Sequence, residues 1–358
     1  MATHLGNFMK IGNYIINRDS PAFIIAELSA NHNGSIEIAK ETIRAAKDAG
    51  ADCVKLQTYT PDTITLDHKS DHFKISQDTV WDGQYLYDLY NQAYTPWEWH
   101  EELFQTCKEE GLESFSSPFD FTAVDFLEEL NVPAYKIASF EITDIPLIEY
   151  TASKMKPIII STGIATFNDI RLAVETCRDV GNNDVVLLKC TSSYPAPLDE
   201  ANMIMISDLA KKFDVIVGLS DHTLGLVAPI TSIALGAKII EKHFILDKSV
   251  GGPDASFSMD KNEFSKMVKS IRQAEMSLGN IDYSLTEKQE KSRVFSRSLF
   301  AVKDIEAGEK ITKENIRSIR PGYGLHPKYF NRILETKLSK KIKKGSPLDQ
   351  SYLSIKLD

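Results

Sequence analysis

The sequence has few cysteines, no long apolar run and no excess of positive charge. No CxxC pair occurs, which excludes a thiolate metal site and fits a reducing compartment; the four cysteines are Cys53, Cys107, Cys177 and Cys190. No stretch approaches a membrane span, and residues 1–6 lack the features of a secretion signal, so we expect a cytoplasmic protein. A net charge of −9 argues against a general nucleic-acid binder.

Charge is unevenly distributed along the 358 residues. Residues 285–358 hold 17 lysines and arginines against 9 acidic residues, whereas the rest of the chain holds 24 against 41. A basic tail and an acidic body favour docking of the two, within one chain or between subunits. The alternative is that these charges only keep the surface solvated, which would explain the same charge balance without docking.

Short β-branched segments alternate with amphipathic stretches of helical period. Eight strands are expected, at 22–27, 53–57, 114–117, 134–138, 157–161, 185–189, 215–219 and 238–243. Helices between them include 36–49, 97–110 (capped by Thr95), 168–180 and 261–278. The pattern predicts an α/β fold, a closed (βα)8 TIM barrel. An open doubly wound sheet is the alternative, although no GxGxxG follows the first strand.

The domain organisation follows from this pattern. A short strand at 11–17 precedes the barrel, which we place at 1–284; a polar linker at 285–297 and a small domain at 298–358 follow it. The connection at 59–94 is longer than ordinary loops and is interpreted as a lid or binding loop. A domain of about 60 residues buries only a small apolar core, so we expect it to pack against a neighbouring domain or subunit.

Two histidines end neighbouring strands of this barrel. His222 closes the segment GLSDH and His243 closes the segment IIEKH. Both imidazoles should reach the carboxyl end of the barrel, close enough to share one divalent metal ion, although two hydrogen-bonded histidines without a metal are the alternative. Manganese, zinc, cobalt and magnesium are all compatible with such a site.

Two lysines lie inside apolar strands, where each needs an anion. Lys55 and Lys136, together with nearby hydroxyls, would bind phosphate and carboxylate oxygens; the hydroxyls are those of Ser117, Ser139, Ser161, Ser192 and Ser220. A Schiff-base lysine and a structural pair with Glu27 or Glu141 are alternatives. Asp254 follows a glycine-rich loop and lies over the barrel mouth, unless that loop is a plain turn.

These residues occur in motifs that resemble the sialic acid synthase family. The motifs cover nearly the whole chain and lie at 26–34 (AELSANHNG), 55–58 (KLQT), 116–119 (SSPF), 135–139 (YKIAS), 161–163 (STG), 218–222 (GLSDH), 241–243 (EKH) and 320–322 (RPG). Within the family, SANH at 29–32, TPWEWH at 95–100, SFE at 139–141 and GYGLHP at 322–327 are most similar to the pseudaminic acid branch.

The resemblance implies a barrel followed by an antifreeze-like (SAF-type) domain, in a homodimer where each tail domain caps the partner's barrel. It also implies a metal-dependent transferase that condenses phosphoenolpyruvate with 2,4-diacetamido-2,4,6-trideoxy-altrose, giving pseudaminic acid and phosphate for surface glycans such as glycosylated flagellin. Manganese, magnesium or cobalt is the expected ion, with zinc still open. N-acetylneuraminate and legionaminate synthesis are the alternatives within the family.

The resemblance also distributes roles among the residues. Phosphoenolpyruvate is expected at Lys55, Lys136 and the five serines, and the metal at His222 and His243. Glu27 is the candidate base for water, and Glu141 acts on a sugar hydroxyl or on ring opening. The sugar is expected at Gln57, Tyr194, Asp254 and Arg320.

Two functions of other classes are alternatives. One is a metal-dependent aldolase that cleaves a keto acid without phosphate, and phosphate release separates it from a synthase. The other is a sugar-binding protein whose basic tail contacts nucleic acid, but that tail lacks the interleaved aromatic residues of RNA-binding modules. We therefore expect neither a nucleic-acid nor a membrane partner.

Overall fold

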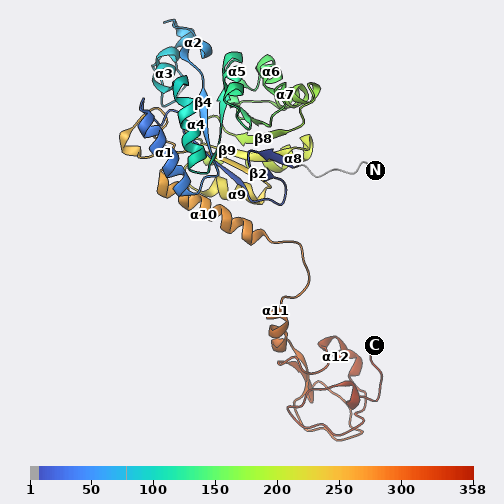
Figure 1. Cartoon of the computed structure of the whole chain (residues 1–358). Coiled ribbons are helices and arrows are strands. Elements are labelled where there is room, and N and C mark those ends of the chain that lie inside the picture. Colours follow the sequence, from blue (N-terminus) through green and yellow to red (C-terminus); the bar gives the residue numbers. More distant parts are fainter. Residues whose placement is uncertain (1–7, 78) are drawn as a thin grey trace. The chain divides into compact units, whose positions relative to one another are not determined.

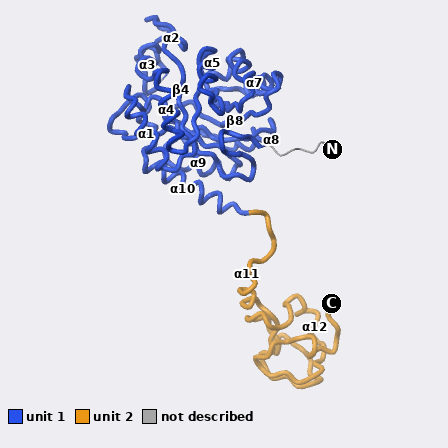
Figure 2. Tube along the Cα trace, in the orientation of Figure 1, with its two compact units in different colours: residues 1–279 blue, residues 280–358 orange. Residues whose placement is uncertain are grey.

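The computed structural model describes residues 8–77 and 79–358 (Figure 1). The predicted absence of a secretion signal at residues 1–6 concerns a segment outside these ranges. Two compact units are present, residues 1–279 and 280–358 (Figure 2). Within the described ranges, no helix is both long and apolar enough to cross a membrane.

The first unit is the predicted closed barrel of eight parallel strands. Each strand lies within two residues of its predicted bounds, because most of the strands are short buried runs rich in Ile, Val, Leu or Phe. Around the barrel the strands follow one another in chain order, from β3 (Phe23–Glu27) through β4 (Cys53–Thr58), β5 (Glu113–Pro118), β6 (Tyr135–Ile137), β7 (Ile158–Ser161), β8 (Val185–Cys190) and β9 (Ile216–Asp221) to β10 (Ile239–His243), which pairs with β3.

Helices cover the outside of the barrel (Figure 1). Several of them begin at side-chain caps such as Ser35 and Asp260, which accept hydrogen bonds from the free backbone N–H groups of the first turn. The helices are α1 (Ile36–Ala49), α4 (His100–Glu109), α5 (Phe121–Glu129), α6 (Ile145–Ala152), α7 (Phe167–Asp179), α8 (Met205–Phe213), α9 (Val227–Ala234) and α10 (Lys261–Leu278).

One predicted helix start is wrong. Instead of a helix from residue 97 capped by Thr95, the chain forms the 3-10 turn η2 (Trp97–Trp99), whose N-cap is Pro96, and only then α4. The hydroxyl of Thr95 is instead 3.3 Å from Nε2 of His32.

The prediction of one N-terminal strand at 11–17 is also wrong. The segment is a hairpin of β1 (Met9–Ile11) and β2 (Tyr14–Ile16), which turns at Gly12, whose φ of 56° favours glycine. Ile11 and Ile16 are buried in the same apolar cluster as Phe23 of β3. The hairpin therefore closes the amino end of the barrel.

Shorter elements lie in the connections. The long segment between β4 and η2 holds α2 (Pro61–Ile64), η1 (Asp71–Phe73) and α3 (Leu86–Ala93). Three 3-10 turns follow strands β6, β8 and β10, namely η3 (Ser139–Glu141), η4 (Leu198–Glu200) and η5 (Lys248–Val250).

The second unit has its own apolar core, which includes Leu299, Ile316, Ile333 and Leu348. Strands β11 (Ser298–Ala301) and β12 (Ile316–Ile319) pair antiparallel in it. Its other elements are α11 (Glu287–Ser292) and η6 (Arg293–Phe295), within the segment expected as a linker, then η7 (Pro327–Tyr329), α12 (Phe330–Ile333) and η8 (Gln350–Tyr352).

Candidate active site at the carboxyl end of the barrel

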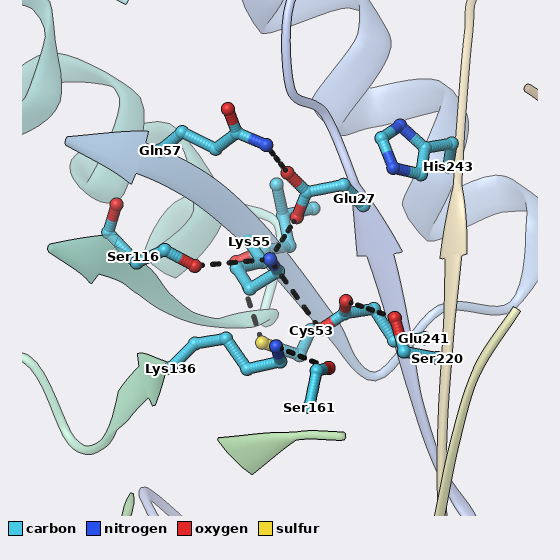
Figure 3. Close-up of polar contacts among 12 residues, drawn as sticks. Glu27, Cys53, Lys55, Gln57, Ser116, Lys136, Ser161, Ser220, Glu241 and His243 are labelled. Carbon is cyan, nitrogen blue, oxygen red and sulfur yellow. Dashed lines mark hydrogen bonds and ion pairs between the residues drawn. The ribbon is translucent and has the colours of Figure 1, made fainter. Parts of the chain in front are cut away.

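Polar side chains from β3, β4, β5 and β10 converge inside the barrel, because parallel strands end at one edge and alternate residues face inward. Nζ of Lys55 lies 2.8 Å from Oε2 of Glu27 and 3.6 Å from Oε2 of Glu241 (Figure 3). The same ammonium donates to the hydroxyl of Ser117 at 3.2 Å. All four residues are buried. The Lys55–Glu27 pair that the sequence left as an alternative is therefore present.

The charges in this group are set by burial and by each other. Burial alone would lower the pKa of Lys55, but the carboxylates of Glu241 and Glu27 outweigh it and raise that pKa. Burial raises the pKa of Glu27 to about 7, with Lys55 opposing the rise. Lys55 therefore stays charged and is a poor Schiff-base nucleophile. Glu27 titrates close to neutral pH, as a general acid or base should.

Among the described residues, Lys136 is a buried cation without a direct ion pair, although the charge of Glu241 acts on it. Its Nζ donates to the hydroxyl of Ser161 at 2.7 Å and to the carbonyl of Ile137 at 3.0 Å. Among the residues that the structure describes, no carboxylate lies within ion-pairing distance, and burial lowers the pKa of Lys136. A buried ammonium in this state favours an anionic ligand that supplies the missing charge.

Two of the predicted serines form a pair beside a glycine. Ser192 donates to the hydroxyl oxygen of Ser139 at 2.7 Å, and that oxygen also accepts the backbone N–H of Ile164 at 3.1 Å. A Cβ at Gly163 would lie 2.1 Å from Oγ of Ser192 and 2.5 Å from Oγ of Ser139. Gly163 was not predicted as a site residue, although its position directly after β7 was a usable signal.

Ser220 was predicted in the same set of serines but has a different partner. Its hydroxyl donates to Oε1 of Glu241 at 2.9 Å. Burial would raise the pKa of Glu241, but the charges of Lys136 and Lys55 outweigh it and lower that pKa. Glu241 was not among the predicted site residues. Its place two residues before His243, and hence on the same face of β10, was the signal.

The two histidines lie together, with ring centroids 5.4 Å apart. Nδ1 of His222 is 3.0 Å from the carbonyl of Thr191, so we assign the proton to Nδ1, which leaves Nε2 as the free nitrogen. Burial, with the charges of Lys55 and Lys242, holds the pKa of His243 well below its usual range, so its ring is neutral.

These residues fit a divalent ion. Nδ1 of His243 is buried without a hydrogen-bond partner, and it lies 3.6 Å from Oδ2 of Asp254. In residues 8–77 and 79–358, no group of three or more His, Cys, Asp and Glu side chains is arranged to hold a metal. The protein would therefore contribute two imidazoles and leave the other positions to water and substrate, as in a catalytic site.

Three aromatic rings cover the histidines, and we call them the aromatic cluster: Trp81, Tyr194 and Phe257. Tyr194 lies 4.3 Å from His222, and Phe257 lies 5.0 Å from His243, between ring centroids. Trp81 lies 5.4 Å from Tyr194, and its indole N–H donates to the carbonyl of Pro253 at 3.0 Å. Trp81 belongs to the long connection predicted as a lid, but neither it nor Phe257 was predicted as a site residue.

Three predicted site residues remain, namely Gln57, Glu141 and Arg320. Gln57 donates to Oε1 of Glu27 at 3.0 Å. Oε2 of Glu141 is buried without a hydrogen-bond partner, and burial raises the pKa of Glu141 to about 7, with Lys136 opposing the rise. Arg320 follows β12 in the second unit.

A family model of the NeuB family matches residues 42–283, more than half of the chain. The chain belongs to the NeuB family. A SAF domain model matches residues 296–353, which confirms the predicted antifreeze-like domain.

Curated proteins and a solved structure are similar to most of the chain. The chain is 50% identical over 96% of its length to a pseudaminic acid synthase of Campylobacter jejuni, covering 99% of it. It is 51% identical over 92% of its length to that of Helicobacter pylori, covering 96%. The solved N-acetylneuraminic acid synthetase of Leptospira borgpetersenii is 29% identical and superposes with a TM-score of 0.72, over 81% of this chain and 96% of that one.

Proposed function

We propose that this NeuB-family enzyme condenses phosphoenolpyruvate with 2,4-diacetamido-2,4,6-trideoxy-β-L-altropyranose, giving pseudaminic acid and inorganic phosphate. The identities of about 50% to two pseudaminic acid synthases, against 29% to an N-acetylneuraminic acid synthetase, favour this acceptor branch. The four cysteines are free and buried, which fits the cytoplasm as the compartment. Surface glycans, flagellin included, are the proposed destination of the product.

One observation carries the proposal: the unpaired ammonium of Lys136 among serine hydroxyls, inside the same barrel mouth as the histidine pair. Ser161 contacts Lys136 directly, and the Ser139–Ser192 pair is positioned by Gly163. A phosphate or carboxylate there would gain charge-assisted hydrogen bonds. We assign phosphoenolpyruvate to this group, with Lys55 and Ser117 at its other side and Ser220 acting through Glu241.

The proposed reaction forms one carbon–carbon bond and breaks one carbon–oxygen bond. The CH2 carbon of phosphoenolpyruvate bonds to the aldehyde carbon of the open-chain sugar, and the aldehyde oxygen takes a proton. Water adds to the former enol carbon and loses a proton, which leaves a hydroxyl on that carbon. This hydroxyl then loses its proton and becomes the keto oxygen as the bond from the carbon to the phosphate oxygen breaks and phosphate leaves. The products are an α-keto acid and inorganic phosphate.

We assign proton transfer to the two glutamates whose pKa values lie near 7. Glu27 would take the proton of the attacking water, and Lys55 and Gln57 hold its carboxylate in place. Glu141 would exchange a proton with a sugar oxygen, because its Oε2 has no protein partner. His222 and His243 would hold the divalent ion, manganese, magnesium or cobalt by preference. When bound, the ion supplies Lewis-acid polarisation of the aldehyde oxygen.

The aromatic cluster supports an acceptor with apolar substituents. Tyr194 and Phe257 contact the histidine rings, and Trp81 contacts Tyr194. Beside such rings, acetamido methyl groups and the C6 methyl of a deoxysugar would gain more from burial than hydroxyls would. We place Asp254 and Gln57 beside the polar groups of the sugar. N-acetylneuraminate and legionaminate synthesis have less support, and a phosphate-free aldolase would leave Lys136 without its anion.

A homodimer in which the SAF domain of one chain caps the barrel of another is part of the proposal. Large apolar side chains are exposed in the connections at the carboxyl end of the barrel, among them Phe140, Ile164, Leu224 and Val250. Such a ring of apolar residues around a site marks an interaction surface. Arg320 of the partner chain would then donate hydrogen bonds to an acetamido oxygen.

One assay tests the proposal. Purified full-length protein is incubated with phosphoenolpyruvate and either the altrose derivative or N-acetylmannosamine, with and without a chelator, and phosphate release is followed. Phosphate release with the altrose derivative that stops with chelator supports the proposal. Turnover only with N-acetylmannosamine would overturn the acceptor, and product formation without phosphate would overturn the reaction.

A further inference from the structure

A buried ion pair lies behind the two histidines, on the opposite face of the same strands. Asp221 of β9 and Lys242 of β10 are register partners in the sheet, and their side chains approach to 2.7 Å between Oδ2 and Nζ. Each side chain is only 1% exposed. Because neighbouring residues alternate between faces, this pair points away from Glu241 and His243, which face the barrel interior.

Apolar residues otherwise fill that outer face. Leu219 and Ile240, two residues before Asp221 and Lys242, belong to the apolar cluster between strands and helices. Moving two charges into such a layer is costly, and apolar residues of similar volume are often at least as stabilising. Stability is therefore a poor explanation for this pair, and a positional role is a better one.

The further contacts of the pair all fix the backbone around His222. Oδ1 of Asp221 accepts the N–H of Thr223 at 2.9 Å, and Nζ of Lys242 donates to the carbonyl of Thr223. Asp221 and Thr223 flank His222 in sequence, and Lys242 directly precedes His243. One ammonium group thus ties together the two strand ends that carry the imidazoles.

We propose that Lys242 and Asp221 are positioning residues, which set the separation of His222 and His243 so that both bind one divalent ion. This inference rests on the proposed function. Neither side chain contacts substrate or metal. Groups behind a metal ligand that fix its orientation commonly change metal affinity by about 10- to 100-fold.

The test measures Mn²⁺ binding to the full-length protein by electron paramagnetic resonance of the free ion, alongside phosphoenolpyruvate binding and thermal unfolding. Lys242→Met is compared with Lys238→Met, a lysine at the opposite end of β10 whose ammonium donates to the carbonyl of Ser20 at 2.9 Å. We expect Lys242→Met to weaken Mn²⁺ binding at least about tenfold. Lys238→Met should leave Mn²⁺ binding unchanged, and phosphoenolpyruvate binding should be unchanged in both.

A double variant separates positioning from stability. Lys242→Met alone leaves Asp221 buried and unpaired, whereas Asp221→Leu with Lys242→Met leaves no charge in the layer and should recover the unfolding temperature. Weak Mn²⁺ binding in a stable double variant supports the inference. Recovery of both properties, or unchanged Mn²⁺ affinity in Lys242→Met, would overturn it. Mn²⁺ binding unaffected by His222→Ala and His243→Ala would overturn the proposed metal site itself, and this inference with it.

Discussion

The two halves of the barrel interior differ sharply although the same strands build both. At the amino end, Phe23 and Ile159 lie in an apolar cluster that the N-terminal hairpin closes. Two to four residues further along the same strands, the inward positions hold Glu27 and Ser161. The sheet itself is unchanged between the two halves, so side-chain identity alone divides the interior into a part that stabilises and a part that binds.

The carboxyl half carries an energetic cost that the amino half does not. Among the described residues, the buried side-chain atoms without a hydrogen-bond partner all lie in or beside the carboxyl half, on Glu27, Asn31, Glu141, Thr223, Glu241 and His243. Lys55 offsets the charges of Glu27 and Glu241, whereas the unpartnered atoms of Glu141 and His243 are destabilising unless a ligand or ion gives them a partner. This half is therefore arranged for bound substrates and an ion rather than for the empty protein.

The largest expected effect is at Lys136. Replacing Lys136 with Met removes the unpaired cation, so phosphate release should fall about 10²–10³-fold, as for other preorganised electrostatic groups. The unfolding temperature should stay the same or rise, because a buried charge without a partner is lost. Phosphate-release kinetics and thermal unfolding are the measurements.

Lys189 is the matched control for that variant. It lies on β8, and its ammonium donates to the carbonyl of Cys190 at 2.6 Å. We expect Lys189→Met to keep most of the activity. Equal losses of activity in both variants would show that the effect of Lys136→Met is not specific to the cation inside the barrel.

The amino half should show the opposite response. Phe23 is 2% exposed and packs edge-to-face on Tyr14, with ring centroids 5.0 Å apart. Phe23→Ala should lower the free energy of unfolding by about 3–5 kcal/mol. The KM for phosphoenolpyruvate should not change in the folded fraction. Denaturant unfolding measures the loss of stability, and steady-state kinetics measures the KM. A raised KM with unchanged stability would contradict the difference between the two halves of the barrel.

Gly163 tests how closely the serine pair is packed. In Gly163→Ala the new Cβ would push apart the hydroxyls of Ser139 and Ser192, so phosphoenolpyruvate binding should weaken about tenfold, the loss of roughly one good hydrogen bond. Isothermal titration of phosphoenolpyruvate measures it. Ser192→Ala removes one hydroxyl without any clash and should weaken binding less. A larger effect of Ser192→Ala would argue against the crowding described at Gly163.

The smallest effect concerns the pH dependence of stability at Glu141. Because burial raises its folded pKa from 4.5 to about 7, the folded state binds the proton more tightly, and stability falls as pH rises from 4.5 through 7. Glu141→Gln removes this loss, so its unfolding temperature should exceed that of the native protein by about 5 °C at pH 8, and the two should converge near pH 4.5. Thermal scans across pH measure the difference, and an equal gain at every pH would show that titration is not its cause.

Much of the fold was predictable because its signals are local. Most barrel strands are short runs rich in Ile, Val, Leu or Phe, and α1 and α10 begin and end at the predicted residues. The histidine pair was predictable for the same reason: His222 and His243 end consecutive strands, and consecutive parallel strands end side by side. The N-terminal hairpin was missed because a three-residue strand is too short for a periodic pattern.

Partners across the barrel could not be predicted, because nothing local specifies which charges pair. The sequence did not indicate that the charges of Lys55 and Lys136 would both act on Glu241, that Ser220 would donate to Glu241, or that Trp81 would reach Tyr194. These contacts depend on strand register and loop path, which tertiary packing fixes.

The placement of the two imidazoles on adjoining strands also limits how the chain can change. Helix α9 and its turns connect His222 to His243, and they set which residues of β10 face inward. Losing or gaining a single residue next to β10 would rotate Lys242 into the cavity and His243 out of it, since strand side chains alternate. This segment should therefore accept replacements more readily than insertions or deletions. The segment between β4 and η2 contains no barrel strand, so we expect insertions and deletions to be better tolerated there.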